Sequence, residues 1–135
     1  MIEFQVNGQE YRAGKIDARA QFHIVRRLAP VLGEAAPAAQ NGGLEALPAL
    51  AKALAAMTDE NADYVLFGLL RAVERKEPQG MSWSAVASGN ALMYQDIGMP
   101  EMMQLSWHAL KHNLGDFFRA LPSGLSGKIP AQSAQ

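Results

Sequence analysis

Two histidines near the end of the chain have a spacing that could bind a metal ion. His108 and His112 are four residues apart, so both imidazoles would reach one cation if this segment is helical. The helical zinc-protease pattern also needs a glutamate directly after the first histidine, where this chain has Ala109, and no third ligand follows nearby. Since each helical residue turns by about 100°, an inward-facing Trp107 places both imidazoles on the helix flank. We interpret them as solvated and expect no metal site.

Other patterns of catalytic or phosphate-binding residues are incomplete. Gly127-Lys128 is similar to the end of a phosphate-binding loop, but that loop needs glycine where Pro122 stands and serine or threonine where Ile129 stands. No Gly-x-Ser-x-Gly sequence occurs, and serine, histidine and aspartate show no order that suggests a catalytic triad. We therefore predict that the protein is not an enzyme and uses no cofactor.

Three carboxylates close together, Asp59, Glu60 and Asp63, could form a metal site or an acid–base pair. Carboxylates are also favourable at the positive N-terminal end of a helix. We interpret the three residues as the start of a helix that Thr58 or Asp59 caps, because the helix dipole favours carboxylates there.

A group of basic side chains could contact phosphate. Arg19, Arg26 and Arg27 surround His23. The chain as a whole is balanced, with 12 basic and 13 acidic residues, and no recognition-helix pair or set of stacking aromatics accompanies the arginines. A charged solvent face, or a surface that forms salt bridges with a partner protein, is the better interpretation.

Length and composition are those of one soluble globular domain. The chain has 135 residues, of which 49% are hydrophobic, and this is enough to form a buried core. It contains no cysteine, so disulfides and thiolate metal sites are excluded. The opening residues lack the pattern of a signal peptide, and no apolar run approaches the roughly 18 residues of a membrane span. We expect a cytoplasmic protein that binds neither membrane nor nucleic acid.

The first part of the chain predicts a β-hairpin and then a helix. Residues 2–16 alternate apolar and polar side chains around Asn7-Gly8, a dipeptide typical of two-residue hairpin turns. Asp17 is a suitable residue to cap the following helix. Its apolar stripe, read at three- and four-residue spacings, consists of Ala18, Phe22, Val25, Ala29 and Leu32.

The remaining chain predicts a loop at 33–43, helices at 46–57 and 59–76, and a last helix at 100–121. Residues 81–98 are predicted to be irregular or to form a short turn of helix. The fold class is therefore mainly α. We expect a single domain of about four helices with an N-terminal hairpin over residues 1–121, followed by a flexible tail at 122–135.

The start of the last helix is apolar on two sides. Met102, Leu105 and Ala109 lie nearly opposite the stripe that contains Trp107, and Met99 and Met103 add to them. Such a helix must be covered on both sides or present a partner surface. Residues 81–97 could supply the cover. Otherwise these side chains form a pliable surface for a partner protein.

Several segments resemble the tail assembly chaperones of long-tailed bacteriophages and prophages. They are FQVNGQEYRAG at residues 4–14, QFHIVRRLAP at 21–30, LMYQDI at 92–97 and NLGDF at 113–117. The resemblance implies a small, largely helical protein of the host bacterial cytoplasm. It also implies that the protein coats the tape-measure protein, keeps it soluble, helps recruit tail-tube subunits, self-associates and is absent from the finished virion.

On this resemblance we expect the partner surface to include Met99, Met102, Leu105 and Ala109, with Arg19, Arg26 and Arg27 adding electrostatic selection. Two alternatives remain open. One is a small helical nucleic-acid-binding regulator from a mobile element, which a strongly salt-dependent affinity for nucleic acid would support. The other is an enzyme of unfamiliar type built around the two late histidines.

Overall fold

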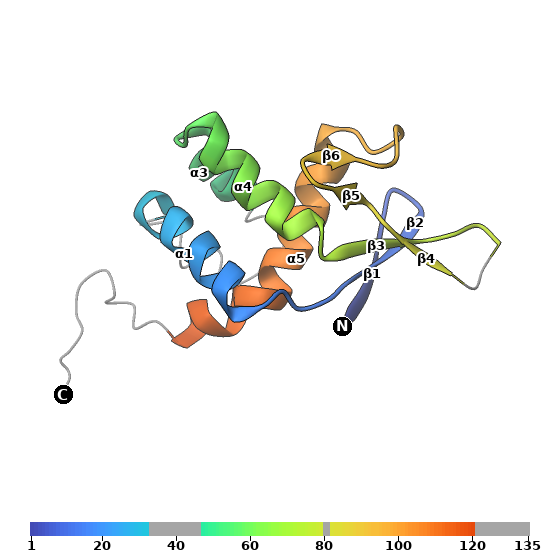
Figure 1. Ribbon diagram of the computed structural model, residues 1–135, viewed down its shortest axis with the longest axis horizontal. Coiled ribbons are helices and arrows are strands. Elements are labelled where there is room, and N and C mark those ends of the chain that lie inside the picture. Colours follow the sequence, from blue (N-terminus) through green and yellow to red (C-terminus); the bar gives the residue numbers. More distant parts are fainter. Residues whose placement is uncertain (33–46, 80–81, 121–135) are drawn as a thin grey trace.

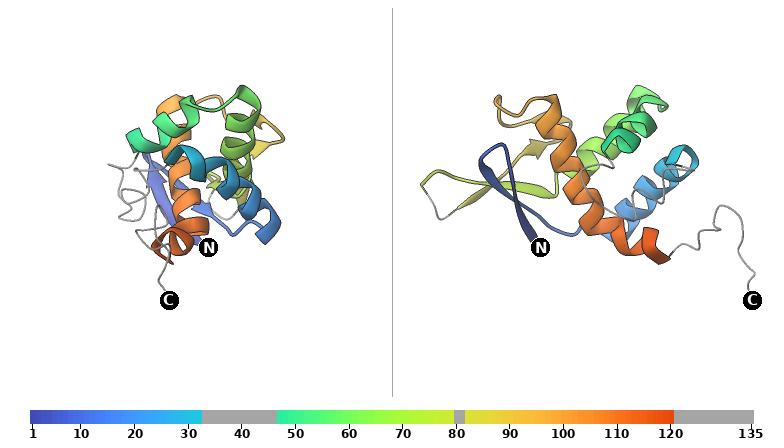
Figure 2. Two further views of the ribbon diagram at one scale, coloured as in Figure 1. Left: turned by 90° about the vertical axis from the view of Figure 1, so that its left-hand side faces the viewer. Right: turned by 180° about the vertical axis from the view of Figure 1, so that it is seen from behind.

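The computed structural model describes residues 1–32, 47–79 and 82–120, and the predicted loop at 33–43 and tail at 122–135 lie outside this part. Within it, four helices combine with a four-stranded antiparallel sheet. The helices are α1 (Ala18–Leu32), α3 (Leu47–Ala55), α4 (Asp59–Leu70) and α5 (Met99–Ala120). In Figures 1 and 2 the sheet extends from one side of the helices. The predicted mainly α class is therefore wrong, because the sheet is a second major layer.

The sheet joins distant parts of the chain. Its strands are β1 (Ile2–Val6), β2 (Gln9–Ala13), β3 (Val73–Lys76) and β4 (Trp83–Ala85), which lie in that order. Pairing of β2 with β3 places Ala13 opposite Val73. A separate two-stranded ladder contains β5 (Ala87–Ser88) and β6 (Ala91–Leu92). The segment at 81–98, predicted to be irregular, thus contributes three short strands.

The N-terminal hairpin is confirmed with its predicted turn. Asn7 and Gly8 have φ angles of 52° and 81°. A two-residue turn with positive φ at both positions matches the twist of the flanking strands, and glycine adopts such angles without steric cost.

Helix α1 begins where the sequence predicts but buries a different face. The Asp17 carboxylate caps it, accepting a hydrogen bond of 2.7 Å from the backbone N–H of Ala20. The residues in the core are Ile24 and Leu28, both fully buried, whereas Phe22 of the predicted stripe is 61% exposed. The sequence alone did not show that α4 offers Gly68, which leaves room for the Ile24 side chain.

Helix α4 starts at the predicted cap and ends earlier than predicted. Thr58 Oγ1 accepts a hydrogen bond of 3.1 Å from the N–H of Asn61. The helix stops at Leu70, and residues 73–76, predicted to be helical, form β3. Pairing with strands on both sides overrides the weak local preference of this segment for helix.

Helix α5 is the centre of the molecule. It packs against the other three described helices and against β1 and β2. Its residues in the core include Leu105, Ala109, Leu110 and Leu114, each no more than 2% exposed. No helix in the described part is long and apolar enough to cross a membrane.

A single buried amide fixes α5 to the chain between β2 and α1. Asn113 Oδ1 accepts hydrogen bonds from the N–H of Ile16 at 2.7 Å and from the Gln21 side chain at 3.1 Å. Its Nδ2 donates to the carbonyl oxygens of Gly14 and Ala109, both at 3.0 Å. The four bonds use both ends of the amide, so one side chain sets the position of hairpin, α1 and α5.

Candidate partner-binding surfaces

The apolar residues predicted to bind a partner on α5 separate into two groups. Met99 is 70% exposed and Met102 is partly buried. Leu105 and Ala109 are fully buried in the core. In this conformation only the two methionines are accessible to another protein, and the two deeper residues hold the fold together.

The N-terminal hairpin covers part of the face of α5 that contains Leu105. Glu101, Leu105 and His108 follow at spacings of four and three residues, so they share one face of α5. Asn7, in the hairpin turn, hydrogen bonds to Glu101 at 3.3 Å, and the Phe4 ring of β1 stacks on His108 with 4.1 Å between centroids. The second apolar face of the helix is thus packed against the sheet.

The two late histidines are not the solvated flank residues expected from their spacing. His108 is stacked under Phe4, and burial lowers its pKa. His112 is partly buried, and its pKa is lowered by burial and then by nearby Lys15. No cluster of three potential metal ligands occurs among the described residues.

The three arginines assigned to the partner surface also separate. Arg19 and Arg26 are exposed on α1. Arg27 turns towards α4, where its guanidinium lies 3.9 Å from the centroid of the Tyr64 ring and its Nε donates to Asn61 Oδ1 at 3.1 Å. Arg27 therefore contributes to the packing of α1 on α4, and the other two arginines face solvent.

Sequence reasoning missed the exposure of Phe22. This ring is 61% exposed and lies on α1 between Arg19 and Arg26, three residues after one and four before the other. The signal was present, because those arginines share its helix face and arginine seldom lines a core. Its place in the three- and four-residue apolar spacing of α1 led to the opposite prediction.

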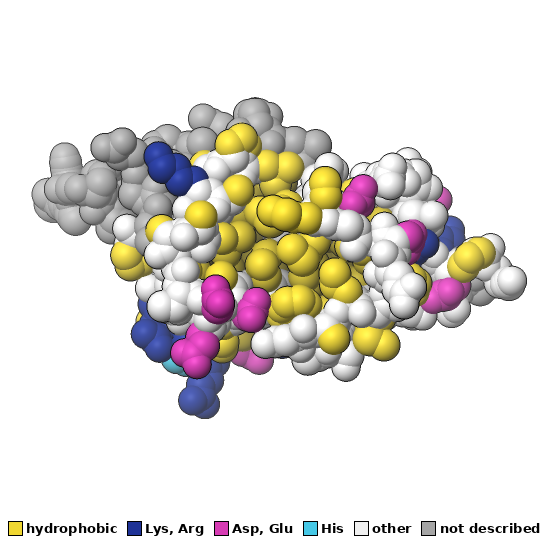
Figure 3. Space-filling view, turned by 90° about the horizontal axis from the view of Figure 1, so that it is seen from above, with side chains coloured by type: hydrophobic (Ala, Val, Ile, Leu, Met, Phe, Trp, Pro, Cys, Tyr) yellow, Lys and Arg dark blue, Asp and Glu magenta, His cyan; other side chains and the backbone are white. Residues whose placement is uncertain are grey.

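Hydrophobic side chains gather on one face of the molecule. Figure 3 shows them in the middle of the upper face, between α3 and α4 on one side and the start of α5 with β6 on the other, and acidic side chains lie near the margin. We define the upper apolar face by the exposed and partly exposed methionines at the start of α5: Met99, Met102 and Met103.

The methionines of this face lie on the same side of α5 as residues that are buried further along the helix. Met99, Met102 and Met103 lie on the same side of α5 as Ser106 and Leu110, which are enclosed by the other helices. The same stripe thus passes from core to surface at the start of the helix. Unbranched methionine side chains adapt readily to different partner shapes.

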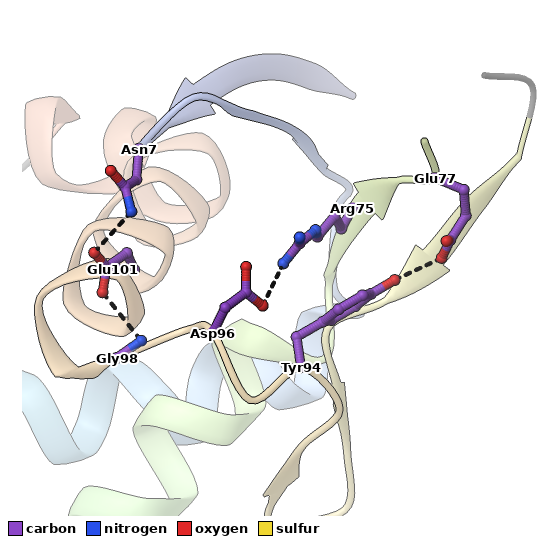
Figure 4. A network of polar contacts seen from close by, with 7 residues as sticks. All are labelled: Asn7, Arg75, Glu77, Tyr94, Asp96, Gly98 and Glu101. Atoms are coloured by element: carbon purple, nitrogen blue, oxygen red, sulfur yellow. Dashed lines mark hydrogen bonds and ion pairs between the residues drawn. The ribbon is translucent and has the colours of Figure 1, made fainter. Parts of the chain in front are cut away.

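Polar contacts hold the start of α5 in place, as Figure 4 shows. One oxygen of the Glu101 carboxylate accepts a hydrogen bond of 3.0 Å from the N–H of Gly98, and the other accepts the bond from Asn7. The first contact caps the helix and the second attaches it to the hairpin turn. The methionine end of α5 is therefore fixed relative to the sheet.

The segment before α5 is attached to β3 and its following turn. Arg75 donates to Asp96 at 2.9 Å, and this bond is the main cause of the lowered pKa of Asp96. The Tyr94 hydroxyl donates to Glu77 at 2.6 Å, and hydrogen bonds from Ser84 and Tyr94 lower the pKa of Glu77. Both carboxylates are thus held in the ionised form that these donors require.

A cavity of about 320 Å³ opens between the start of α1 and the end of α4. Its cationic lining residues already have partners. Lys15 donates to the carbonyl oxygen of His112 at 2.5 Å, and Arg71 donates to that of Gly89 at 2.8 Å. The cavity therefore offers no preassembled anion site.

The fold and these surfaces define a small α+β protein whose exposed features suit contact with other macromolecules. The chain matches the sequence model of a family described as phage tail assembly chaperone protein, TAC, over residues 7–126. Neither the curated proteins nor the solved structures give a match. Since the family match covers most of the chain, the protein belongs to the phage tail assembly chaperones, and the resemblance read from its residues is confirmed.

Family membership implies a role in phage tail assembly through contacts with tail proteins. It favours that role over a nucleic-acid-binding regulator, and the family is one of chaperones rather than enzymes.

Proposed function

We propose that this chaperone binds the tape-measure protein of a phage or prophage tail, keeps it soluble in the host cytoplasm and helps recruit tail-tube subunits. It acts as a homo-oligomer and leaves before the virion is complete. The observation that carries the proposal is the upper apolar face at the start of α5. Met99 of this face is 70% exposed, although the same stripe of the helix is buried from Ser106 onwards, two turns further on.

The physical role of this face is to cover apolar helix surfaces of the partner. A long chain with exposed apolar stripes aggregates unless those stripes are shielded. Methionine side chains can follow the shapes of successive segments without one fixed pattern of contacts. Individual contacts can be weak if neighbouring chaperones also touch each other, because binding along one chain is multivalent.

Coexpression with the tape-measure protein tests the proposal. The double variant Met99→Asp with Met102→Asp places charge on the upper apolar face without entering the core. We expect most of the tape-measure protein to become insoluble with this variant and to stay soluble with the wild-type chaperone.

Met93→Asp is the matched control, because Met93 is a methionine that is 58% exposed and lies outside the defined face. This variant should keep the tape-measure protein soluble. Circular dichroism and thermal unfolding establish that all variants are folded. A folded double variant that still keeps the tape-measure protein soluble would contradict the assignment of this face.

A further inference from the structure

The outward side of α1 carries a basic stripe with an aromatic centre. Arg19, Phe22 and Arg26 are exposed and follow at spacings of three and four residues, so they share one helix face. We call these three residues the basic stripe. An exposed phenylalanine between two cations is suited to a surface that is both apolar and acidic.

The outward side of α4 carries the complementary pattern. Asp59, Glu60 and Asp63 are exposed at the start of the helix, and Phe67, which is partly exposed, follows one turn later on the same side. We call these four residues the acidic stripe. Like the basic stripe, it combines charges of one sign with one aromatic ring.

Neither stripe is neutralised by an ion pair within the described part of the chain. The ion pairs found there all involve the sheet, and none includes a residue of either stripe. Partial desolvation and the neighbouring Arg26, Arg27 and Arg19 lower the pKa of His23, which lies beside the basic stripe. Positive charge therefore accumulates on this side of α1.

The two helices that carry the stripes are neighbours. Arg27, Asn61 and Tyr64 form polar and ring contacts between α1 and α4, and Ile24 packs at Gly68. These contacts occupy the sides that face each other, which leaves both stripes on the outside. Figure 3 shows acidic and basic side chains meeting along one edge of the molecule.

We propose that two copies of this chain pair through α1 and α4, with the basic stripe of each copy on the acidic stripe of the other. One two-fold axis satisfies both contacts, because every copy supplies one stripe of each sign. Pairing covers Phe22 and places Arg19 and Arg26 beside carboxylates. A second copy fits this surface because the two stripes carry opposite charges. Both stripes also have a similar spacing along a helix and one aromatic ring each.

The proposal specifies the self-association that forms part of the proposed function. It uses surfaces separate from the upper apolar face, so its test needs only the chaperone. A wild-type chain that does not pair but keeps the tape-measure protein soluble would refute this inference alone. A wild-type chain that pairs as proposed but leaves the tape-measure protein insoluble would refute the proposed function alone.

Sedimentation of the full-length chain over a range of concentrations measures the pairing. The variant Arg19→Glu with Arg26→Glu and the variant Glu60→Lys with Asp63→Lys each place like charges across the contact. Each should weaken pairing on the order of tenfold or more. An equal mixture of the two variants should restore it, because every contact between unlike copies then joins opposite charges.

Lys52→Glu and Glu3→Lys are controls, since both residues are exposed charges on other elements and should leave pairing unchanged. Phe22→Gln keeps the charges and should also weaken pairing, which provides a second variant if a reversed one does not fold. A mixture that stays monomeric, a wild-type chain that is monomeric throughout, or growth beyond two copies would overturn the proposal.

Discussion

Asn113 Oδ1 accepts a hydrogen bond of 2.7 Å from the backbone N–H of Ile16, a residue 97 positions earlier in the chain. The N–H lies in the link between the hairpin and α1, where neither a strand nor a helix supplies a backbone acceptor. The side chain of Asn113 is 7% exposed, so water cannot easily replace it. One amide thus satisfies the backbone at the junction of three elements.

Replacing Asn113 should be costly. Asn113→Leu leaves the N–H of Ile16 and the carbonyl oxygen of Gly14 without their partner. Each unsatisfied buried polar group costs about 1–3 kcal/mol, so we expect the free energy of unfolding to fall by about 2–5 kcal/mol. Urea denaturation measures it. The exposed substitution Gln5→Ala should change it by about 0.5 kcal/mol at most, and equal effects of both would refute the role of Asn113.

The two groups of predicted partner residues on α5 should respond differently to truncation. Leu105→Ala removes a side chain that is 0% exposed and should lower the free energy of unfolding by about 2–5 kcal/mol. Met99→Ala removes an exposed side chain and should change it by about 0.5 kcal/mol at most. Thermal or urea denaturation of both variants distinguishes core from surface. A neutral Leu105→Ala would contradict the packing of the hairpin on α5.

Stability should depend on pH through His108. Its folded-state pKa lies below the ordinary value of 6.5, because burial disfavours the charged imidazole. The unfolded chain therefore takes up the proton first as the pH falls. The contribution of His108 to stability is complete above about pH 6.5 and decreases below it, until the pH reaches the lowered folded pKa.

His108→Phe keeps a ring against Phe4 and removes the titration. Unfolding free energies at about pH 7.5 and 5.5 should therefore differ less in this variant than in the wild type. Part of the pH dependence remains, because the pKa of His112 is also lowered. An unchanged difference would show that the pKa of His108 is the same in the folded and the unfolded chain.

Replacing Gly8 in the hairpin turn should lower stability, because other residues adopt a positive φ only with strain. Gly8 has a φ angle of 81°, and no atom would contact an added Cβ there. Gly8→Ala should therefore cost only the backbone strain, about 1–2 kcal/mol of unfolding free energy. Urea denaturation measures this loss, and an unaffected midpoint would contradict the turn geometry.

Turns and helix caps could be predicted from the sequence, because in each of them a residue acts on its immediate neighbours. The turn at Asn7-Gly8 and the caps at Asp17 and Thr58 are such cases, since each depends on the backbone within three residues. Their outcome needs no knowledge of the rest of the fold.

Contacts between distant segments could not be predicted from the sequence. Residues 73–76 form β3 because β2 and β4 supply partners, and one of those partners lies about 60 positions away. The buried face of α1 was misassigned because the room for Ile24 comes from Gly68 on another helix. Periodicity showed that α5 has two apolar sides, but it could not show that the hairpin covers one of them.

The same limit applies to the candidate surfaces. Met99, Arg19 and Arg26 are exposed, whereas Leu105, Ala109 and Arg27 are engaged within the chain. Residue type identified α1 and α5 as the helices that carry exposed candidate residues. Three-dimensional packing determines which of their side chains remain accessible. The structure adds Phe22 and the upper apolar face.

The stacking of Phe4 on His108 has a consequence for synthesis on the ribosome. The first strand leaves the exit tunnel long before α5 is translated. It therefore has no helix to pack against during most of the synthesis of the chain. Contacts that span most of the chain form late and slow the acquisition of structure. A nascent or truncated chain that lacks α5 therefore exposes the apolar residues of its strands to solvent. Such a chain itself needs protection from aggregation.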